Sequence, residues 1–261
     1  MQAEIGIIGG TGLYDSELLR NVEEVTIETP YGYPSDLITI GELKNRRVAF
    51  LPRHAKKHTI RPTDVNSRAN IFALKKLGVR RILAPSAVGS LKEEYKPGDI
   101  VFIDQFIDRT TKREQSFYTG EKVCHISVAE PICPELRQCL FKVAKELGIR
   151  AHNKGTYLCI EGPRFSTKAE SSLFRSWGAD VIGMTLVPEC VLAREAELCY
   201  STIATVTDYD VWKDQPVSAD EVVATMKISA KKVRQIILGA IASLPRTRHC
   251  ECKDALKSAF L

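Results

Sequence analysis

The fold is decided by residues 4–12, which read EIGIIGGTG, a short apolar strand followed at once by a glycine-rich turn. Similar apolar runs recur along the chain and alternate with segments of helical periodicity. This alternation predicts an α/β fold, a single domain over residues 1–261 built around a central mixed sheet, with a cysteine-containing tail at about 246–261. We expect strands at residues 4–9, 22–28, 37–43, 47–52, 81–86, 100–104, 122–128, 155–161, 181–184 and 200–206.

Three helices are predicted from apolar spacing and from end signals. The clearest covers residues 136–147, with Pro134 at its start and Gly148 as its stop. A second begins after Ser218, which forms an S-x-x-E capping box with Glu221. The third spans about residues 63–77. In such folds the chemistry gathers in loops that follow strands, so polar residues at strand ends are the candidates for a site.

Composition restricts the class of protein. The 261 residues are 44% hydrophobic and 26% charged, and the net charge of +5 is too mild to favour nucleic acid as a partner. No apolar run approaches the roughly 18 residues of a membrane span, and the acidic N-terminus does not read as a signal peptide. We therefore expect a cytoplasmic protein that binds neither nucleic acid nor membrane.

Eight cysteines are many for a reduced compartment. The sequence holds no C-x-x-C pair and no His/Cys cluster at zinc spacing, so no metal site is predicted. Intracellular disulfides do occur in hyperthermophiles. The scarcity of Asn and Gln beside plentiful Lys, Arg and Glu is also typical of thermophilic proteins.

The turn GGTG at residues 9–12 allows two interpretations. It fails as a dinucleotide fingerprint, because G-x-G-x-x-G would need a small residue at Asp15 and a full helix before the next strand. Read alone, it is a tight turn. The alternative is a phosphate-binding turn, in which backbone N–H groups and the Thr11 hydroxyl face an oxyanion.

Three other strand ends carry candidate anion donors. Arg53 and His54 close one predicted strand, where a guanidinium fork and an imidazole can hold phosphate. Ser86 and Ala87 follow a buried strand, where small side chains let a ligand approach the backbone, and Thr185 follows another. Each of these alone is more often a solvated residue or a cap. The sequence around them matches neither a zinc H-E-x-x-H pattern nor a G-x-S-x-G hydrolase elbow.

A pair of acids, Asp208 and Asp210, closes the predicted strand at residues 200–206. Two such side chains can point into one pocket where the chain unwinds, although a solvated turn is equally consistent with the pattern. A carboxyl pair can serve as proton donor and hydrogen-bond acceptor. An anion site together with a separate acid pair suggests phosphorolysis, the cleavage of a bond by phosphate.

Seven motifs occur in order along the chain: GIIGGTGLY at 6–14, PRH at 52–54, VNSRANI at 65–71, SAVGSL at 86–91, IEGPRFS at 160–166, GMT at 183–185 and TDYDVW at 207–212. Together they resemble the trimeric class of the purine nucleoside phosphorylase family, and its branch acting on methylthioadenosine in particular. The resemblance runs from about residue 4 to the C-terminus. The tail CEC at 250–252 is similar to that of the archaeal, heat-stable members.

The resemblance implies phosphorolysis of the N-glycosidic bond of 5′-methylthioadenosine, giving adenine and 5-methylthioribose 1-phosphate. Inorganic phosphate would be the co-substrate, without a metal or an organic cofactor. The implied fold is a mixed, partly barrel-like sheet flanked by helices, and the implied assembly is a homotrimer or a dimer of trimers. A nucleoside and phosphate would be its small-molecule partners.

The resemblance also assigns roles to matching positions. Phosphate binding falls to Thr11, Arg53, His54, Ser86, Ala87 and Thr185. Contacts to the nucleoside fall to Phe165, Met184, Asp208, Tyr209, Asp210, Val222 and Val223, with Ser166 and Ala219 shaping the base and 5′ pockets. His125 would be lent by a neighbouring subunit to cover the 5′ substituent.

Three positions depart from the family's pattern. Ser67 stands where many relatives carry tyrosine, and Ala219 is smaller than the valine of some relatives. Gly183 replaces an asparagine of some relatives, which predicts the loss of a polar contact. None of the three belongs to the phosphate-binding set.

The cysteines form two candidate pairs. Relatives carry a cysteine pair at positions matching Cys133 and Cys199, which implies a structural disulfide. Cys250 and Cys252 flank a single residue, so a disulfide between them would close a very small, easily reduced ring. Two free thiols are the alternative for this second pair.

The acid pair suits adenine as a leaving group. Adenine leaves once N7 is protonated, which a carboxylic acid at Asp208 can do if burial raises its pKa, while Asp210 accepts from the N6 amine. Two carboxylates therefore favour 6-aminopurines over 6-oxopurines. The nearest rival is a broader phosphorylase acting on adenosine, inosine or guanosine. A more distant rival is a nucleotide-binding module without catalysis.

Overall fold

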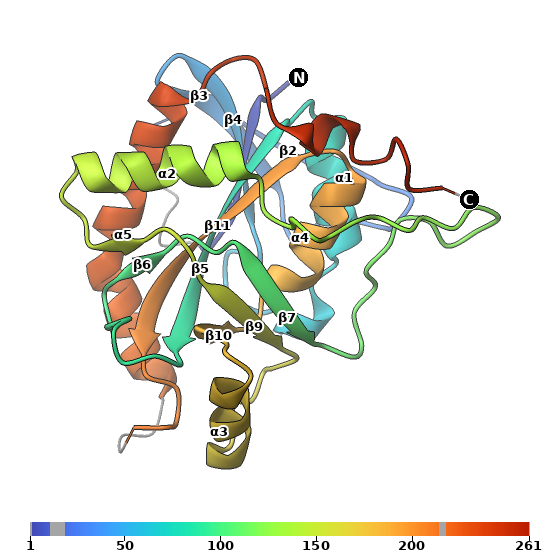
Figure 1. Ribbon diagram of the computed structural model, residues 1–261. Coiled ribbons are helices and arrows are strands. Elements are labelled where there is room, and N and C mark those ends of the chain that lie inside the picture. Colours follow the sequence, from blue (N-terminus) through green and yellow to red (C-terminus); the bar gives the residue numbers. More distant parts are fainter. Residues whose placement is uncertain (1, 11–18, 214–217, 261) are drawn as a thin grey trace.

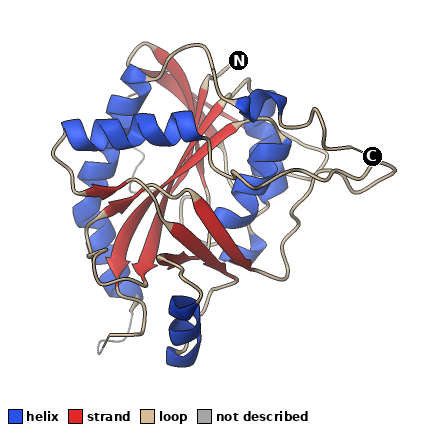
Figure 2. Ribbon diagram, in the orientation of Figure 1, coloured by secondary structure: helices blue, strands red, loops and turns tan. Residues whose placement is uncertain are grey.

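The computed structural model describes residues 2–10, 19–213 and 218–260, with helices on both faces of a large sheet (Figure 1, Figure 2). The strands of this sheet are β1 (Ile5–Gly9), β2 (Arg20–Val25), β3 (Ile38–Leu43), β4 (Arg46–Pro52), β5 (Arg81–Ser90), β6 (Ile100–Val101), β7 (Gln105–Arg109), β8 (Ala151–His152), β9 (Thr156–Ile160), β10 (Val181–Gly183) and β11 (Cys199–Asp208). The α-helices are α1 (Ser67–Lys76), α2 (Pro134–Glu146), α3 (Lys168–Ser176), α4 (Leu186–Glu195) and α5 (Ala219–Ser243). Short 3-10 helices lie at η3 (Pro62–Asp64) and η4 (Glu251–Asp254).

The sheet forks at β5. Its main path runs β2-β3-β4-β1-β5-β10-β9-β7, and a branch leaves β5 through β11 and β6 to β8. The fork is possible because β5 is ten residues long. Its first residues pair with β1, its last with β10, and β11 runs parallel to it from Arg81 to Gly89. Parallel and antiparallel pairs both occur, so the predicted mixed sheet is confirmed.

Both faces of the sheet are covered by apolar side chains. Ile7 of β1 belongs to a cluster completed by residues of α2 and α5, whereas its neighbour Ile8 belongs to a cluster completed by α1 and α4. This alternation is expected of a strand buried on both faces. The two helix layers therefore hold the central strands rigidly and leave the strand ends to form a site. None of the described helices is long and apolar enough to cross a membrane.

Most predicted strands are confirmed, with changed lengths. The strands predicted at 81–86 and 200–206 extend into β5 and β11, and the one predicted at 100–104 shortens to β6. The prediction at 122–128 is wrong: the segment is exposed at Val123 and makes only an isolated bridge, between Cys124 and Phe260. It lacks a partner strand for a ladder, and apolar alternation alone does not supply one. β7 and β8 were not predicted.

The three predicted helices are confirmed as α1, α2 and α5. Pro134 is the first residue of α2, and Gly148 follows its end with a φ of 66°. Ser218 caps α5 by accepting a hydrogen bond from the Glu221 backbone N–H. α1 begins four residues later than predicted, because Asn66 is its N-cap. α3 and α4 were missed. α4 is buried on nearly every side, so it carries no amphipathic signal.

The crossing of α2 and α5 yields a first prediction. A Cβ added at Gly239 of α5 would lie 2.6 Å from Cγ1 of Val143 in α2, and a β-branched side chain cannot turn away easily. Gly239→Ala should therefore destabilise the protein by about 1–3 kcal/mol through overpacking. In a Val143→Ala background the same change should stabilise it by up to about 1 kcal/mol, because alanine is the better helix former. Urea unfolding of the four proteins measures both values, and the same sign in both backgrounds would contradict this packing.

Candidate active site

A pocket opens beyond the carboxyl ends of β4 and β10, and its lining includes Arg53, His54, Ser67, Arg113, Met184 and Thr185. Four of these residues were predicted for the site: Arg53, His54, Met184 and Thr185. They come from segments more than a hundred residues apart in the sequence, so it is the sheet that brings them together. Thr11, also predicted for phosphate, lies outside the described residues.

Arg53 is held rigidly at the floor of this pocket. Its side chain is 5% exposed and forms a bidentate ion pair with Glu189, with Nε 2.5 Å from Oε1 and Nη2 3.1 Å from Oε2. Nη1 donates to the Pro85 carbonyl and Nη2 to the Ile8 carbonyl, both at 3.0 Å. A guanidinium has five N–H groups, and these four bonds leave one of them for a ligand. Burial opposes the charge, yet the Glu189 carboxylate raises the pKa of Arg53 above its usual range.

Glu189 itself was not predicted. It lies inside the apolar segment LVPECVLA at residues 186–193 and is 1% exposed. Besides pairing with Arg53, its Oε2 accepts a hydrogen bond of 2.9 Å from the Tyr200 hydroxyl of β11. A single acid within an apolar run was the available signal, because a buried carboxylate needs a partner. Glu189 fixes the direction in which the Arg53 guanidinium faces.

His54 presents one ring nitrogen to the pocket. Its Nδ1 lies 2.9 Å from the Ile60 carbonyl oxygen, and since a carbonyl only accepts, Nδ1 carries the proton. Burial, together with the nearby charge of Arg53, lowers the pKa of His54 to about 4. The imidazole is therefore neutral near pH 7, and its Nε2 accepts hydrogen bonds. The sequence suggested that His54 would donate a hydrogen bond to the anion. In the structure its neutral ring can instead accept one, from a protonated oxygen of the anion.

Thr185, Ser86 and Tyr157 form a hydroxyl cluster next to Arg53 and His54. Oγ of Ser86 lies 2.8 Å from Oγ1 of Thr185. The Tyr157 hydroxyl accepts from the Thr185 backbone N–H at 3.3 Å and lies 3.5 Å from its Oγ1. Tyr157 is fully buried, so this ring anchors Thr185 from below.

Tyr157 also explains why residue 183 is a glycine. A Cβ at this position would lie 2.1 Å from the Tyr157 hydroxyl oxygen, so a side chain cannot coexist with Tyr157 as it stands. The sequence predicted the loss of a polar contact at Gly183. The structure shows instead that the Tyr157 hydroxyl occupies the space beside Gly183 and supplies a polar contact to Thr185.

Arg113 orders the backbone around the pocket. Its Nη1 donates to the carbonyls of Met184 and Val187, both at 2.6 Å, and its Nη2 donates to the Glu161 carbonyl at 2.6 Å. Its Nε pairs with the Glu161 carboxylate at 3.0 Å. The guanidinium thereby ties β9, β10 and the start of α4 together behind Met184 and Thr185. No pattern in the sequence pointed to Arg113.

Asp208 is placed by a bulge in β11. The pairing with β5 shifts between Val206 and Asp208, so Asp208 lies opposite Gly89. A Cβ on Gly89 would lie 2.8 Å from Oδ1 of Asp208, and only glycine leaves that space open. Both carboxylate oxygens accept hydrogen bonds of 2.7 Å, Oδ2 from the Thr207 hydroxyl and Oδ1 from the Asp210 N–H. The direction of the carboxylate is therefore fixed by its own neighbours in the chain.

Asp210 has a different environment. It is 4% exposed, and its Oδ2 is a buried atom without a hydrogen-bond partner in the part of the chain that the structure describes. Burial raises the pKa of Asp210, although the hydroxyls of Ser171 and Ser166 lie close enough to oppose this. Oγ of Ser166 is likewise buried without a well-formed hydrogen bond. A carboxyl oxygen and a hydroxyl are thus both available to a polar ligand edge.

Several predicted substrate residues are not brought to this pocket within one chain. Phe165 and Val223 are 39% and 51% exposed. Ala219 is also exposed and Val222 partly so, both in the first turn of α5. His125 is exposed on the extended segment after β7, and its backbone N–H donates to the Ala259 carbonyl. Their roles stay predictions.

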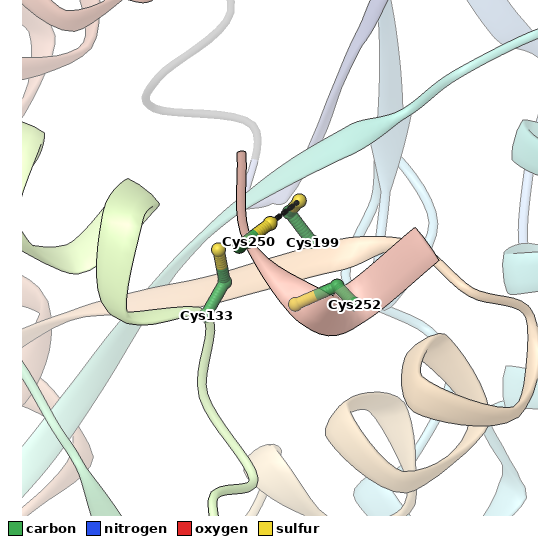
Figure 3. Close-up of side chains that lie close together, drawn as sticks. All are labelled: Cys133, Cys199, Cys250 and Cys252. Carbon is green, nitrogen blue, oxygen red and sulfur yellow. Dashed lines mark hydrogen bonds between the residues drawn. The ribbon is translucent and has the colours of Figure 1, made fainter. Parts of the chain in front are cut away.

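The four cysteines predicted to form disulfides lie together at the opposite end of β11 (Figure 3). The structure contains neither a Cys133–Cys199 nor a Cys250–Cys252 bond, and all eight cysteines are free thiols. The pair in contact is Cys199 and Cys250, whose Sγ atoms are 3.3 Å apart, well beyond the roughly 2.05 Å of a disulfide. The Cys133–Cys199 disulfide is therefore not shown, and Cys250 and Cys252 match the alternative of two free thiols. Folding places the tail against both members of the first pair.

Residues 4–242 match the Phosphorylase superfamily. The S-methyl-5′-thioadenosine phosphorylase of Pyrococcus abyssi is 58% identical over 258 residues, with 99% of each chain covered. That of Thermofilum pendens is 56% identical over 260 residues, covering 100% of this chain and 99% of the relative.

Solved structures agree. A methylthioadenosine phosphorylase from an antarctic soil metagenomic library superimposes with a TM-score of 0.94 at 46% identity, covering 100% of this chain and 93% of that one. A mutant adenosine/methylthioadenosine phosphorylase from Schistosoma mansoni, in complex with methylthioadenosine, gives a TM-score of 0.92 at 40% identity and covers 98% and 96%.

The neutral state of His54 predicts a pH dependence of stability. The pKa of a histidine is about 6.5 in an unfolded chain and about 4 for His54 in the fold. Between these values the unfolded state binds more protons, so the free energy of unfolding decreases as the pH falls from about 6.5 towards 4. Urea titrations at about pH 7 and pH 4.5 measure the free energy of unfolding at each pH. Between the two, this free energy should decrease less for His54→Gln than for the wild type. An equal loss would show that His54 is not held neutral.

Proposed function

The chain belongs to the phosphorylase superfamily and, within it, to the S-methyl-5′-thioadenosine phosphorylases, and from this premise we propose how its site works. The enzyme cleaves the N-glycosidic bond of 5′-methylthioadenosine with inorganic phosphate and releases adenine and 5-methylthioribose 1-phosphate. It is a pentosyltransferase. One observation carries this function: full-length identity of 56–58% to phosphorylases of that name. The convergence of Arg53, His54 and Thr185 on one pocket agrees with it.

Phosphate binds against Arg53, His54, Thr185 and the Ser86-Ala87 backbone in our proposal. Arg53 offers its remaining N–H and a fixed positive charge, and Thr185 and Ser86 offer hydroxyls. His54 accepts from a protonated phosphate oxygen. Arg53 is fixed by Glu189, and Thr185 by Tyr157, before phosphate arrives, so little reorganisation is required. Thr11 is assigned to the same anion by the family resemblance.

The purine edge lies between Asp208 and Asp210. Asp208, whose carboxylate is held in place by the Thr207 hydroxyl and the Asp210 N–H, accepts from the N6 amine. Asp210, whose pKa burial raises, holds the proton that stabilises the leaving adenine at N7. This exchanges the two roles given by the sequence, where Asp208 held the proton. As the bond to adenine lengthens, positive charge grows on the ribose, and the phosphate both stabilises that charge and captures C1′.

The ribose and the 5′ group complete the site. Met184 lines the pocket beside Thr185, and from this position its side chain can pack against the sugar. Phe165, Ser166, Tyr209, Ala219, Val222 and Val223 are proposed to surround the base and the methylthio group. His125 would be lent by a neighbouring copy in a homotrimer or dimer of trimers, which its exposure allows. The reaction needs no metal or organic cofactor, since phosphate is the nucleophile.

A second substrate has specific support. The Schistosoma mansoni neighbours are described as adenosine/methylthioadenosine phosphorylases, so adenosine is a candidate for this chain too. Turnover of methylthioadenosine, adenosine and inosine, each with and without phosphate, tests the proposal. We expect phosphate-dependent adenine release that is fastest from methylthioadenosine and slowest with inosine. Adenine release without phosphate, or a preference for inosine, would contradict it.

The acid pair gives a sharper prediction. Asp208→Asn replaces an acceptor by a donor facing the N6 amine, so kcat/KM on methylthioadenosine should fall at least about tenfold while activity on inosine falls less. In Asp210→Asn the amide cannot give up a proton, so activity should fall and the alkaline decline of the wild-type pH profile should disappear. If Asp210→Asn keeps that decline, the proton does not reside on Asp210.

Tyr157→Phe tests the hydroxyl cluster. Removing one hydroxyl that bonds Thr185 should raise the KM for phosphate roughly 2- to 12-fold, the equivalent of one lost hydrogen bond of about 0.5–1.5 kcal/mol. The KM for methylthioadenosine should change less. Tyr95→Phe, which removes a hydroxyl bonded to the Lys154 carbonyl, serves as the matched control. An unchanged KM for phosphate would show that the Tyr157 hydroxyl does not support phosphate binding.

A further inference from the structure

Four buried thiols converge where no chemistry of the proposed reaction takes place. Cys133, Cys199, Cys250 and Cys252 are at most 9% exposed, and their Sγ atoms all lie within 4.8 Å of one another. Figure 3 shows the four side chains close together, coming from three segments: the start of α2, the start of β11 and the tail at η4.

We propose that these four cysteines form a structural zinc site. Zinc bound by thiolates is tetrahedral with Zn–S distances of about 2.3 Å, so its four sulfurs lie about 3.8 Å apart. The observed sulfurs already fall around that spacing, from 3.3 Å for Cys199 and Cys250 up to the 4.8 Å limit. Adjustments of side-chain torsions close the remaining difference.

Hydrogen-bond donors around the sulfurs support a thiolate site. The Leu136 backbone N–H donates to Sγ of Cys133 at 3.5 Å, at the N-terminus of the 13-residue helix α2. Nη1 of Arg194 lies 3.7 Å from Sγ of Cys252. Four thiolates and one zinc ion leave two negative charges, and a helix N-terminus and a guanidinium offset them. Neutral thiols would have little need of either.

The ion would fasten the tail of the chain. Two ligands precede the tail in sequence by more than fifty residues, and the tail supplies the other two. Hydrogen bonds also hold the tail to the same part of the fold. Nη1 of Arg248 donates to the Glu197 carbonyl at 2.7 Å, and the His249 N–H donates to the Glu135 carboxylate at 2.8 Å. Cys199 begins β11 and Asp208 ends it, so the two sites are roughly 30 Å apart along a ten-residue strand. Four protein ligands leave no open position for substrate, so the role is structural.

The sequence did not reveal this site, since its spacing matches no zinc motif. Cys133 and Cys199 are 66 positions apart, and the C-x-C at 250–252 is shorter than the usual C-x-x-C. A pair of disulfides among the same four cysteines is the competing arrangement, and it excludes zinc because a disulfide sulfur is no thiolate.

Metal analysis of the whole protein, purified with reductant and without chelator, decides between them. We expect about one zinc per chain, and at least tenfold less in Cys252→Ser. Cys139→Ser, a change in α2 outside the cluster, is the matched control and should keep its zinc. Cobalt substituted into the wild type should give the sulfur-to-metal absorption of a tetrahedral thiolate site, which needs no variant to fold.

Thermal unfolding supplies a second readout. A chelator should lower the Tm of the wild type and leave that of Cys252→Ser nearly unchanged, while initial rates at low temperature stay the same in both. Protein that contains no zinc and gives no cobalt spectrum would overturn the proposal, as would peptide mapping that finds the four cysteines paired in two disulfides under these conditions.

Discussion

The pairing of β5 with β11 is the interaction on which the rest of this structure depends. The two strands run parallel from Arg81 and Cys199 to Gly89 and Asp208, buried between two layers of helices. Because the two strands are parallel, Ser86 of β5 and Asp208 of β11 both lie towards the same edge of the sheet, although they are far apart in sequence. The bulge at the end of β11 then sets the direction of the carboxylate. The opposite end of β11 carries the cysteine cluster.

A buried ion pair gives the site its second constraint. Arg53 and Glu189 are each at most 5% exposed, and a buried pair of this kind is a weak source of stability because both ions lose their hydration. The hydrogen bonds to two carbonyls and to Tyr200 offset part of that loss. The pair instead fixes the orientation of the Arg53 guanidinium. Its positive charge is in place before an anion binds, so less reorganisation is needed for catalysis.

Much of the architecture was predictable because local signals and tertiary packing agree. Pro134 and Gly148 bound α2 as the sequence indicates, and Arg53, His54 and Thr185 do meet. Glu189 and Tyr157 were missed, since a buried acid in an apolar helix and a tyrosine in a buried strand follow no periodic pattern. The cysteine cluster depends on where the tail docks. His125 is exposed and Val222 partly exposed in the chain, so the substrate contacts assigned to them stay predictions.

The central claim is that phosphate and purine occupy two subsites joined by the ends of β5 and β11. A crystal structure of the protein with phosphate and adenine tests it most directly. Phosphate should contact Arg53 and Thr185, and the N6–N7 edge of adenine should lie between Asp208 and Asp210. Phosphate bound away from Arg53, or adenine with that edge turned to solvent, would contradict the account.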